Sequence, residues 1–370
     1  MRRAFALGLL TWMLAFGVAG SALTAGPSLV GAYAVPKDLV LEGAPFGGVS
    51  GIDYDSTRGE WLMISDDRSD TAPARFYAVS LTYDGRGVLA FTLKRSIALR
   101  REDGTTFPAT ASSEGERADA EALRVDPLKR QIVWASEGDV ARGFDPSLRR
   151  MSLDGAYRGR ASLPAGLTFD PLGVSGARPN LTVEGLAYAP DGRSLWVSME
   201  APLIQDGPLG SVQAGGLSRI TRLDRQGEVL AQYAYPLDPI QVAPGRGLRA
   251  DNGISEILAA DQHRLLVLER SGVETRKGHF AFHCRLYLVD TRGGQDIAGR
   301  PSLIDGPVRP LAKRLLINFD RLDGVDAGNL EAMAWGPRLK DGRRALVLMA
   351  DDNFDLESPG AILIFAVASL

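Results

Sequence analysis

The chain of 370 residues contains a single cysteine, Cys284, so it can form no disulfide bond within itself. Its stability must therefore come from a packed core, even in an oxidising compartment. Basic residues are also slightly outnumbered, since 42 Lys and Arg face 45 Asp and Glu and give a formal net charge of -3. A nucleic-acid-binding protein needs a basic face, so we expect no nucleic-acid partner.

Two sequence patterns that mark common classes of enzyme are missing as well. Neither Ser50 nor Ser175 lies in a G-x-S-x-G sequence, because the second glycine is absent from both. That sequence builds the nucleophile turn of many serine hydrolases. The chain also has no P-loop, the glycine-rich sequence that cradles nucleotide phosphates. Both classes of enzyme are therefore disfavoured.

The first 25 residues differ from the rest of the chain. Arg2 and Arg3 precede an apolar stretch at 4–19, and small residues follow it. This order is typical of a secretory signal peptide, although a transmembrane anchor of about the minimum length is the alternative. We favour cleavage because no polybasic flank follows. Residues 26–370 then form one domain in the periplasm or outside the cell, a monomer with no stable membrane insertion.

An internal repeat organises the remaining residues. Each repeat has an apolar strand, a polar turn and a second apolar strand that ends in acid, and the repeats recur about every 69 residues. Their first strands begin at Ser50, Glu121, Glu184, Glu256 and Glu331. Two further strand-like runs with alternating polarity follow in each repeat. Two buried inner strands and two alternating outer strands are typical of a propeller blade.

The sequence therefore predicts an all-β fold, a β-propeller of four-stranded blades. The last repeat supplies only three strands, so its fourth should come from the N-terminal side, at 29–33 or 38–41. Pairing the two ends of the chain would close the ring and remove its exposed edges. Five blades are expected, but a degenerate sixth within 278–320 remains open.

Acidic residues recur at two positions of the repeat. The first strands begin with Glu121, Glu184, Glu256 and Glu331, and the second strands end in Asp66, Asp67, Glu137, Glu200, Glu269, Asp351 and Asp352. Both positions lie at the same end of a hairpin, and innermost strands converge on the propeller axis. We therefore expect roughly ten carboxylates around one mouth.

Carboxylates so close together repel and raise one another's pKa. Calcium, which prefers many oxygen ligands, would relieve the repulsion. Neighbouring arginines would do so too, and the candidates are Arg68, Arg75, Arg142 and Arg270. The alternative is that the acids pair with backbone amides or with these arginines and only tie the blades together.

The chain resembles the phytase-like family of bacterial secreted proteins, which is associated with an esterase-like activity. The resemblance rests on GGVSGIDYD at 47–55, ISDD at 64–67, PARFY at 73–77, EGLA at 184–187, GISE at 253–256, LER at 268–270, NLEA at 329–332 and DDNF at 351–354. It implies a propeller with recurrent acids and a phosphatase or ester-hydrolase activity.

We therefore hypothesise a Ca²⁺-assisted hydrolase that acts on a small anionic ester or phosphate. The expected metal ligands are Asp66, Asp67, Glu121, Glu137, Glu200, Glu269, Asp351 and Asp352. The expected catalytic residues are Glu184, Glu256, Glu331, Arg75 and Arg270, with the arginines holding the anion and one glutamate acting as general base.

Two alternatives remain open. The first is a propeller without catalysis that binds a ligand or partner through its loop face. The second is a Ca²⁺-dependent lactonase-type propeller, for which Asn252, Asn329 and Asn353 are the only well-placed asparagine ligands.

Overall fold

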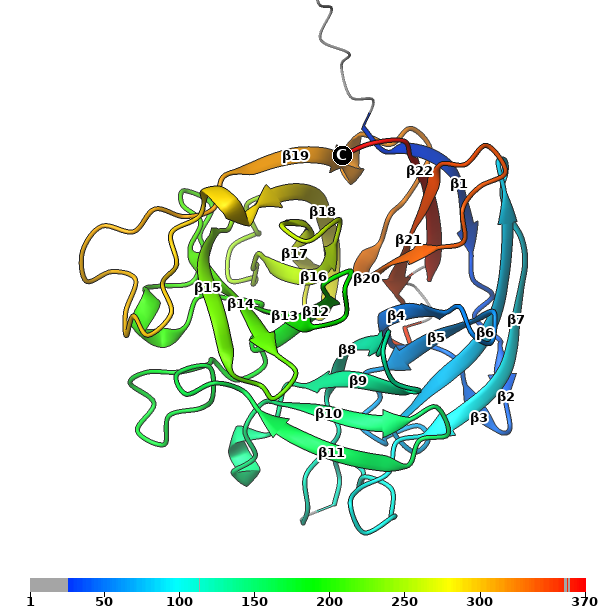
Figure 1. Cartoon of the computed structure of the whole chain (residues 1–370), viewed down its shortest axis with the longest axis horizontal. Coiled ribbons are helices and arrows are strands. Elements are labelled where there is room, and N and C mark those ends of the chain that lie inside the picture. Colours follow the sequence, from blue (N-terminus) through cyan, green and yellow to red (C-terminus); the bar gives the residue numbers. More distant parts are fainter. Residues whose placement is uncertain (1–25, 113, 356–357, 359) are drawn as a thin grey trace, which may run out of the picture.

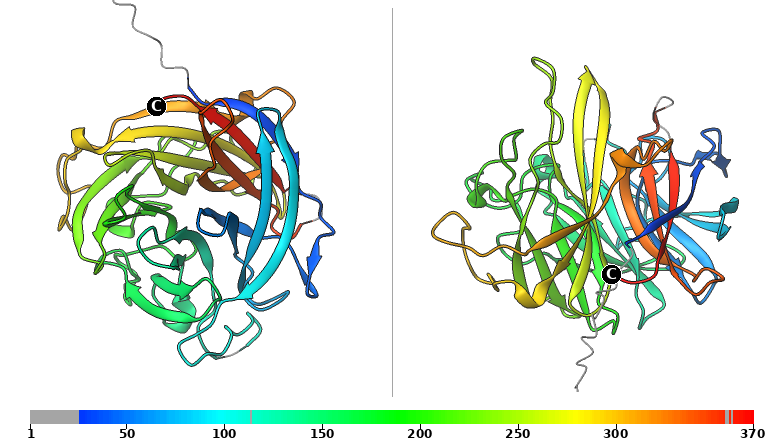
Figure 2. Two further views of the ribbon diagram at one scale, coloured as in Figure 1. Left: turned by 45° about the vertical axis from the view of Figure 1, so that its right-hand side comes forward. Right: turned by 90° about the horizontal axis from the view of Figure 1, so that it is seen from above.

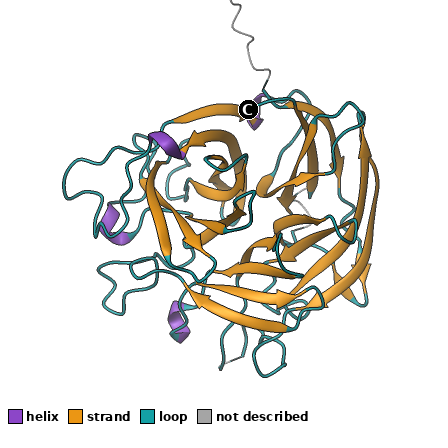
Figure 3. Cartoon of the chain, viewed as in Figure 1, coloured by secondary structure: helices purple, strands orange, loops and turns teal. Residues whose placement is uncertain are grey.

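Each repeat folds into one antiparallel sheet, and the sheets are arranged around a central axis (Figure 1). The computed structural model describes residues 26–112, 114–355, 358 and 360–370, so the predicted signal peptide lies outside the described residues. Strands and loops make up nearly all of these residues (Figure 3). Their helices are three-residue 3-10 turns, η1 (Val140–Arg142), η2 (Ile204–Asp206), η3 (Thr291–Gly293) and η4 (Phe319–Arg321). None is long and apolar enough to cross a membrane.

Five blades of four strands form the ring, as predicted. The first blade contains β4 (Val49–Asp55), β5 (Glu60–Ser65), β6 (Arg75–Asp84) and β7 (Gly87–Ala98). The second contains β8 (Ala120–Val125), β9 (Gln131–Ser136), β10 (Ser147–Ser152) and β11 (Tyr157–Ser162). The third contains β12 (Val183–Tyr188), β13 (Ser194–Met199), β14 (Leu217–Asp224) and β15 (Val229–Pro236). The fourth contains β16 (Gly253–Ala259), β17 (Arg264–Arg276), β18 (His279–Asp290) and β19 (Lys313–Asn318).

The fifth blade closes the ring with strands from both ends of the chain. It contains β20 (Asn329–Gly336), β21 (Arg344–Asp351), β22 (Ala361–Val367) and β1 (Ser28–Ala34). The pairing of β1 with β22 confirms the first of the two expected closing strands. Residues 40–45 instead form a small separate hairpin of β2 (Val40–Leu41) and β3 (Ala44–Pro45). The sixth blade left open at 278–320 does not exist, because this segment supplies β18 and β19 and joins them by a long loop.

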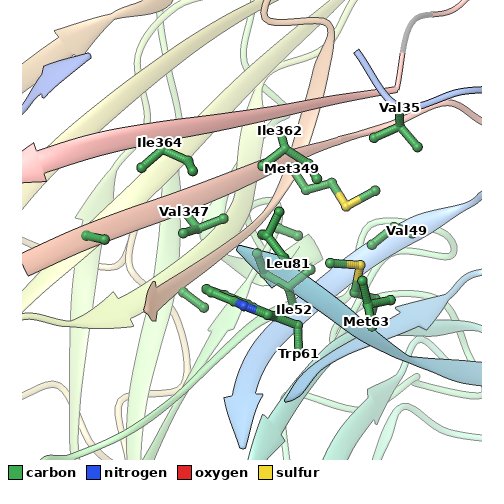
Figure 4. Close-up of a cluster of buried hydrophobic side chains, with 14 of the residues drawn as sticks. Val35, Val49, Ile52, Trp61, Met63, Leu81, Val347, Met349, Ile362 and Ile364 are labelled. Carbon is green, nitrogen blue, oxygen red and sulfur yellow. The ribbon is translucent and has the colours of Figure 1, made fainter. Parts of the chain in front are cut away.

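The core lies between neighbouring blades rather than within one of them. Figure 4 shows the cluster between the fifth and first blades, where Ile52 and Trp61 face Val347 and Ile362, all at most 1% exposed. Each inner strand is thus covered on both faces. This explains why the inner strands are continuous apolar runs instead of alternating ones.

The two ends of the ring differ in their loops. We call the end at which the first strand of each blade begins the mouth. Long connections such as 99–119, 163–182 and 237–252 gather at the mouth. At the opposite end, short turns such as 56–59 and 189–193 join the strands, with the long loop at 291–312 as the exception. The hairpin of β17 and β18 also extends beyond the blades, as the yellow ribbon in the right-hand view of Figure 2 shows. Long loops at one end are typical of a binding face.

One ion pair closes the axis of the ring below the mouth. Arg124 of β8 lies 2.6 Å from the carboxylate of Glu256 of β16, and their side chains are 3% and 0% exposed. The Arg124 guanidinium also donates hydrogen bonds to the carbonyl oxygens of Ile52, Ile257 and Met333. Glu256 accepts hydrogen bonds from the backbone N–H groups of Leu186 and Ile257. The pair therefore connects strands from all five blades.

Replacing Arg124 with methionine should destabilise the protein by about 3–5 kcal/mol, because removal of one partner leaves a buried carboxyl and several carbonyls unsatisfied. Urea unfolding of the purified protein measures this change. Arg95→Met is the matched control, since Arg95 pairs with Glu60 at a half-exposed site. The Arg95→Met variant should lose no more than about 1 kcal/mol of the free energy of unfolding. Equal costs for the two variants would contradict the central role of the axial pair.

Candidate functional site

A β-bulge occurs at the start of every innermost strand. The pairing with the second strand shifts by one residue in all five blades, between Val49 and Gly51, Ala120 and Ala122, Val183 and Gly185, Ile254 and Glu256, and Leu330 and Ala332. The extra residues are Ser50, Glu121, Glu184, Ser255 and Glu331. A bulge turns a side chain away from its regular direction. Here it places one polar residue per blade at the mouth.

This register corrects the prediction for the fourth blade. Ser255, not Glu256, occupies the bulge, and Arg270, not Glu269, stands where the other second strands end in acid. Side chains alternate along a strand, so a register error of one residue reverses the direction in which they point. Glu256 accordingly faces Arg124 on the axis.

Glu269 belongs to a separate polar network between the third and fourth blades. Its carboxylate accepts hydrogen bonds from the Tyr235 hydroxyl at 2.7 Å and from the Asn252 side chain at 2.9 Å, and it pairs with Lys313. These contacts account for the buried charge of Glu269. The structure therefore does not bring it to the predicted mouth site.

Asp67 and Arg75 form a structural pair rather than part of the mouth. Arg75 is 1% exposed and donates to Asp67 at 2.5 Å, to the Tyr77 hydroxyl at 2.7 Å and to the Pro45 carbonyl at 3.0 Å. Although burial opposes ionisation, hydrogen bonds from Thr71 and Arg75 lower the pKa of Asp67. The structure therefore places the Arg75 guanidinium among these groups and not at the mouth, where its predicted role as an anion clamp would need it.

Asp352 also has a local task. Its Oδ1 accepts the backbone N–H groups of Gly48 and Phe354 at 2.9 and 3.1 Å. Gly48 has a φ of +62°, and a Cβ there would lie 2.2 Å from Oδ1 of Asp66. The glycine thus lets the 47–48 backbone pass beside Asp66, and Asp352 holds it there.

The remaining predicted acids gather at the mouth together with Asp119, which the sequence analysis did not identify. We call this set the acid ring: Asp66, Asp119, Glu121, Glu137, Glu184, Glu200, Glu331 and Asp351. Asp119 precedes β8, outside the repeat position from which the other acids were recognised. Its place two residues before Glu121 is the only sequence signal that points to it.

Burial and mutual repulsion dominate the electrostatics of the acid ring. Burial, with repulsion from Glu331 and Asp119, raises the pKa of Asp66 to about 8. Burial, with repulsion from Asp119 and Glu200, raises the pKa of Glu137 to about 8. The pKa of Glu200 rises to about 7, again through burial, although Arg270 opposes the change. Burial also raises the pKa values of Glu121, Glu184 and Asp351 well above their ordinary values.

Two arginines enter the ring and neutralise part of its charge. Arg270 contacts Glu331 and lies 3.1 Å from Glu200, so it joins the third, fourth and fifth blades. Arg68 lies 2.6 Å from Asp119, and its side chain is 36% exposed. Arg142 instead holds a mouth loop by donating to the carbonyls of Thr110 and Gly115. Two guanidinium groups cannot balance all the carboxyls of the ring.

The ring also fits a hard divalent cation such as Ca²⁺. Carboxylate oxygens of Asp119, Glu121 and Glu137 lie within 4.8 Å of one another, and so do those of Glu137, Glu184 and Glu200. Glu137 is common to both groups, and all these residues are buried. Oδ2 of Asp351 is buried without a hydrogen-bond partner among the described residues. Oxygen donors in such number are the ligands that Ca²⁺ prefers.

The family model called phytase-like, described as esterase-like activity of phytase, matches residues 44–354. The chain belongs to this family. The match includes every residue of the acid ring as well as the axial pair. No curated protein matches the chain.

The solved structures that match the chain are similar to it only weakly. The hydrazine synthase of Kuenenia stuttgartiensis is 12% identical with a TM-score of 0.38, over 85% of this chain and 80% of that chain. An α-L-arabinanase of Penicillium chrysogenum, complexed with arabinobiose, is 10% identical with a TM-score of 0.41, over 88% and 79%. A mannose phosphorylase of Leishmania mexicana, in complex with phosphate, is 10% identical with a TM-score of 0.39, over 88% and 85%. Similarity this low gives no indication of the activity of the chain.

Without divalent metal, the free energy of unfolding should fall as the pH rises from about 4.5 to about 8. The ring carboxyls ionise near pH 4 in the unfolded chain, but Asp66, Glu137 and Glu200 keep their protons in the fold up to a pKa of about 7 to 8. The folded state therefore binds more protons in this interval, and stability decreases with pH. Urea unfolding in EDTA at about pH 5, 6.5 and 8 measures this fall in the free energy of unfolding. Stability that rises across this interval would contradict the raised pKa values.

Proposed function

We propose that this phytase-like protein is a Ca²⁺-assisted hydrolase of phosphate or carboxylic esters, with the acid ring as its active site. The observation that carries the proposal is the presence of two clusters of three buried carboxylates, which have Glu137 in common. Buried carboxylates in this number are costly to the fold unless a cation binds them. The family match, with its esterase-like description, supports ester hydrolysis as the use of such a site.

Each part of the ring has a distinct task in this proposal. Asp119, Glu121, Glu137, Glu184 and Glu200 would hold the cation. When bound, Ca²⁺ would supply positive charge that polarises the ester and offsets the charge of the ring. Arg68 and Arg270, rather than Arg75, would bind the anionic part of the substrate, because both guanidinium groups reach the ring.

Asp66 suits proton transfer. In the metal-free ring, burial with repulsion from Glu331 and Asp119 raises the pKa of Asp66 to about 8. A carboxyl that keeps its proton at neutral pH could donate it to the oxygen of the leaving group as the ester bond breaks. The oxygen of a water molecule bonds to the acyl or phosphoryl group, and the proton that this water releases returns to the Asp66 carboxylate. Asp66 is not one of the carboxylates proposed to hold the cation, and the close approach of Gly48 fixes its position.

The two alternatives differ from this proposal in measurable ways. A propeller that only binds a ligand would respond to Ca²⁺ but turn over no ester. A lactonase-type site needs asparagine ligands, and Asn329 does lie at the ring, where it contacts Glu331 and Arg270. Asn252 instead contacts Glu269 and Asp238 outside the ring, and Asn353 is exposed. A comparison of lactones with phosphate and carboxylic esters as substrates separates these activities.

Glu137→Gln should lower Ca²⁺ affinity at least tenfold, which is about 1.4 kcal/mol. It should also lower turnover of 4-nitrophenyl phosphate or 4-nitrophenyl acetate by about a hundredfold. Calorimetric titration with Ca²⁺ and a steady-state assay measure the two effects. Glu60→Gln is the control, because Glu60 begins β5 at the end of the ring opposite the mouth. The proposal fails if wild-type protein turns over neither substrate nor phytate in Ca²⁺ and EDTA leaves its melting temperature unchanged.

A further inference from the structure

The hairpin of β17 and β18 continues directly from the acid ring. Arg270, which contacts Glu200 and Glu331, lies in β17, and the strand extends six residues further to Arg276. Beyond Arg270 the hairpin projects from the mouth (Figure 2). A substrate whose ester group lies at Arg270 would therefore have this hairpin beside it.

Two phenylalanines share the face of the hairpin on which Arg270 lies. Arg270 pairs with Cys284, Gly272 with Phe282, and Glu274 with Phe280. Residues directly opposite each other share a face, and so do alternate residues along a strand. At about 3.3 Å per residue, Phe282 and Phe280 thus follow Arg270 at about 7 and 13 Å along the same face.

The contacts of these rings agree with that placement. The two rings stack with centroids 6.3 Å apart and planes 25° apart. A Cβ at Gly272 would lie 3.6 Å from the Phe282 ring and 3.7 Å from the Phe280 ring, so both rings lie over the glycine. The guanidinium of Arg249 lies 5.4 Å from the Phe280 ring. These contacts hold both rings in place while leaving them half-exposed.

A cavity of about 530 Å³ lies against this aromatic surface. Phe280 and Phe282 line one side of it, together with Arg276 and His279 of the same hairpin, and Asn353 lines the other. Asn353 follows Asp351 of the acid ring by two residues, and Phe282 follows Arg270 along the hairpin, so both segments that line the cavity continue from residues at the ring. Asn353 and Phe354 both have positive φ values, of 49° and 51°.

We propose that Phe280 and Phe282 form a subsite for an aromatic group, and that the preferred substrates are therefore aryl esters. The aryl group would stack on the phenylalanines while the ester reaches the acid ring. This inference rests on the proposed function, because the ring must hold the anionic end of the same molecule. Aromatic stacking contributes about 0.5–1.5 kcal/mol beyond the burial of area.

The test compares phenylphosphonate with methylphosphonate, two anions with the same head group that the enzyme cannot hydrolyse. Calorimetric titration into the full-length, Ca²⁺-loaded protein should show phenylphosphonate binding at least tenfold more tightly. The double variant Phe280→Ala/Phe282→Ala should reduce that ratio to about one and leave methylphosphonate affinity unchanged. Phe280→Leu/Phe282→Leu keeps apolar volume without the ring and should restore only part of the ratio.

Leu172→Ala/Val174→Ala is the matched control, because these two exposed apolar residues lie on another mouth loop. It should keep the full preference for the phenyl compound. Equal wild-type affinities for the two phosphonates would overturn the subsite and leave the proposed function intact. If neither phosphonate binds, both the subsite and the proposed function are overturned. If the folded alanine variant keeps the preference for the phenyl compound, the aryl group binds elsewhere and the subsite is overturned.

Discussion

The buried pair of Arg124 and Glu256 is the contact on which the geometry of the mouth depends. A five-bladed ring brings five innermost strands so close to the axis that little room remains between them. One guanidinium and one carboxylate fill this space, and their hydrogen bonds reach the backbone of every blade. Burial raises the pKa of Glu256, whereas Arg124 and the backbone N–H groups of Ile257 and Leu186 counteract the rise. The pair fixes the spacing of the strands whose first residues carry the acid ring, and it gives the mouth a closed floor.

At the mouth, the same bulge recurs in every blade, and three of the five bulges carry a glutamate. These carboxylates are buried and close together, so the fold has few groups with which to stabilise their charge. Regular pairing would turn Glu121, Glu184 and Glu331 away from the positions they occupy. The energy cost of burying them is met only in part by Arg68 and Arg270. The acid ring thus has more carboxyls than its two arginines can neutralise. This excess is the physical reason for proposing a cation at Glu137, which both clusters of carboxylates share.

The repeat in the sequence was sufficient to predict the propeller, its ring closure and most of the acid ring. Continuous apolar inner strands and a recurring acid are strong signals, because each blade must bury two strands and end them at the mouth. The fourth blade could not be aligned from sequence, since Ser255 and Arg270 replace the acids there and Glu256 and Glu269 stand one residue away. Asp67, Arg75 and Asp352 were misplaced for a different reason: local hydrogen bonds, which have no periodic pattern, determine their directions.

The measurement that tests the account most directly is a crystal structure of the protein soaked in Ca²⁺, with anomalous data that identify the ion. We predict an anomalous peak in the ring, at about 2.3–2.6 Å from oxygens of Glu137 and its neighbours, the range typical of Ca²⁺ ligands. We also predict that the Arg124–Glu256 pair is unchanged beneath it. A ring with no such peak, in which the acids contact only Arg68, Arg270 and one another, would contradict the account.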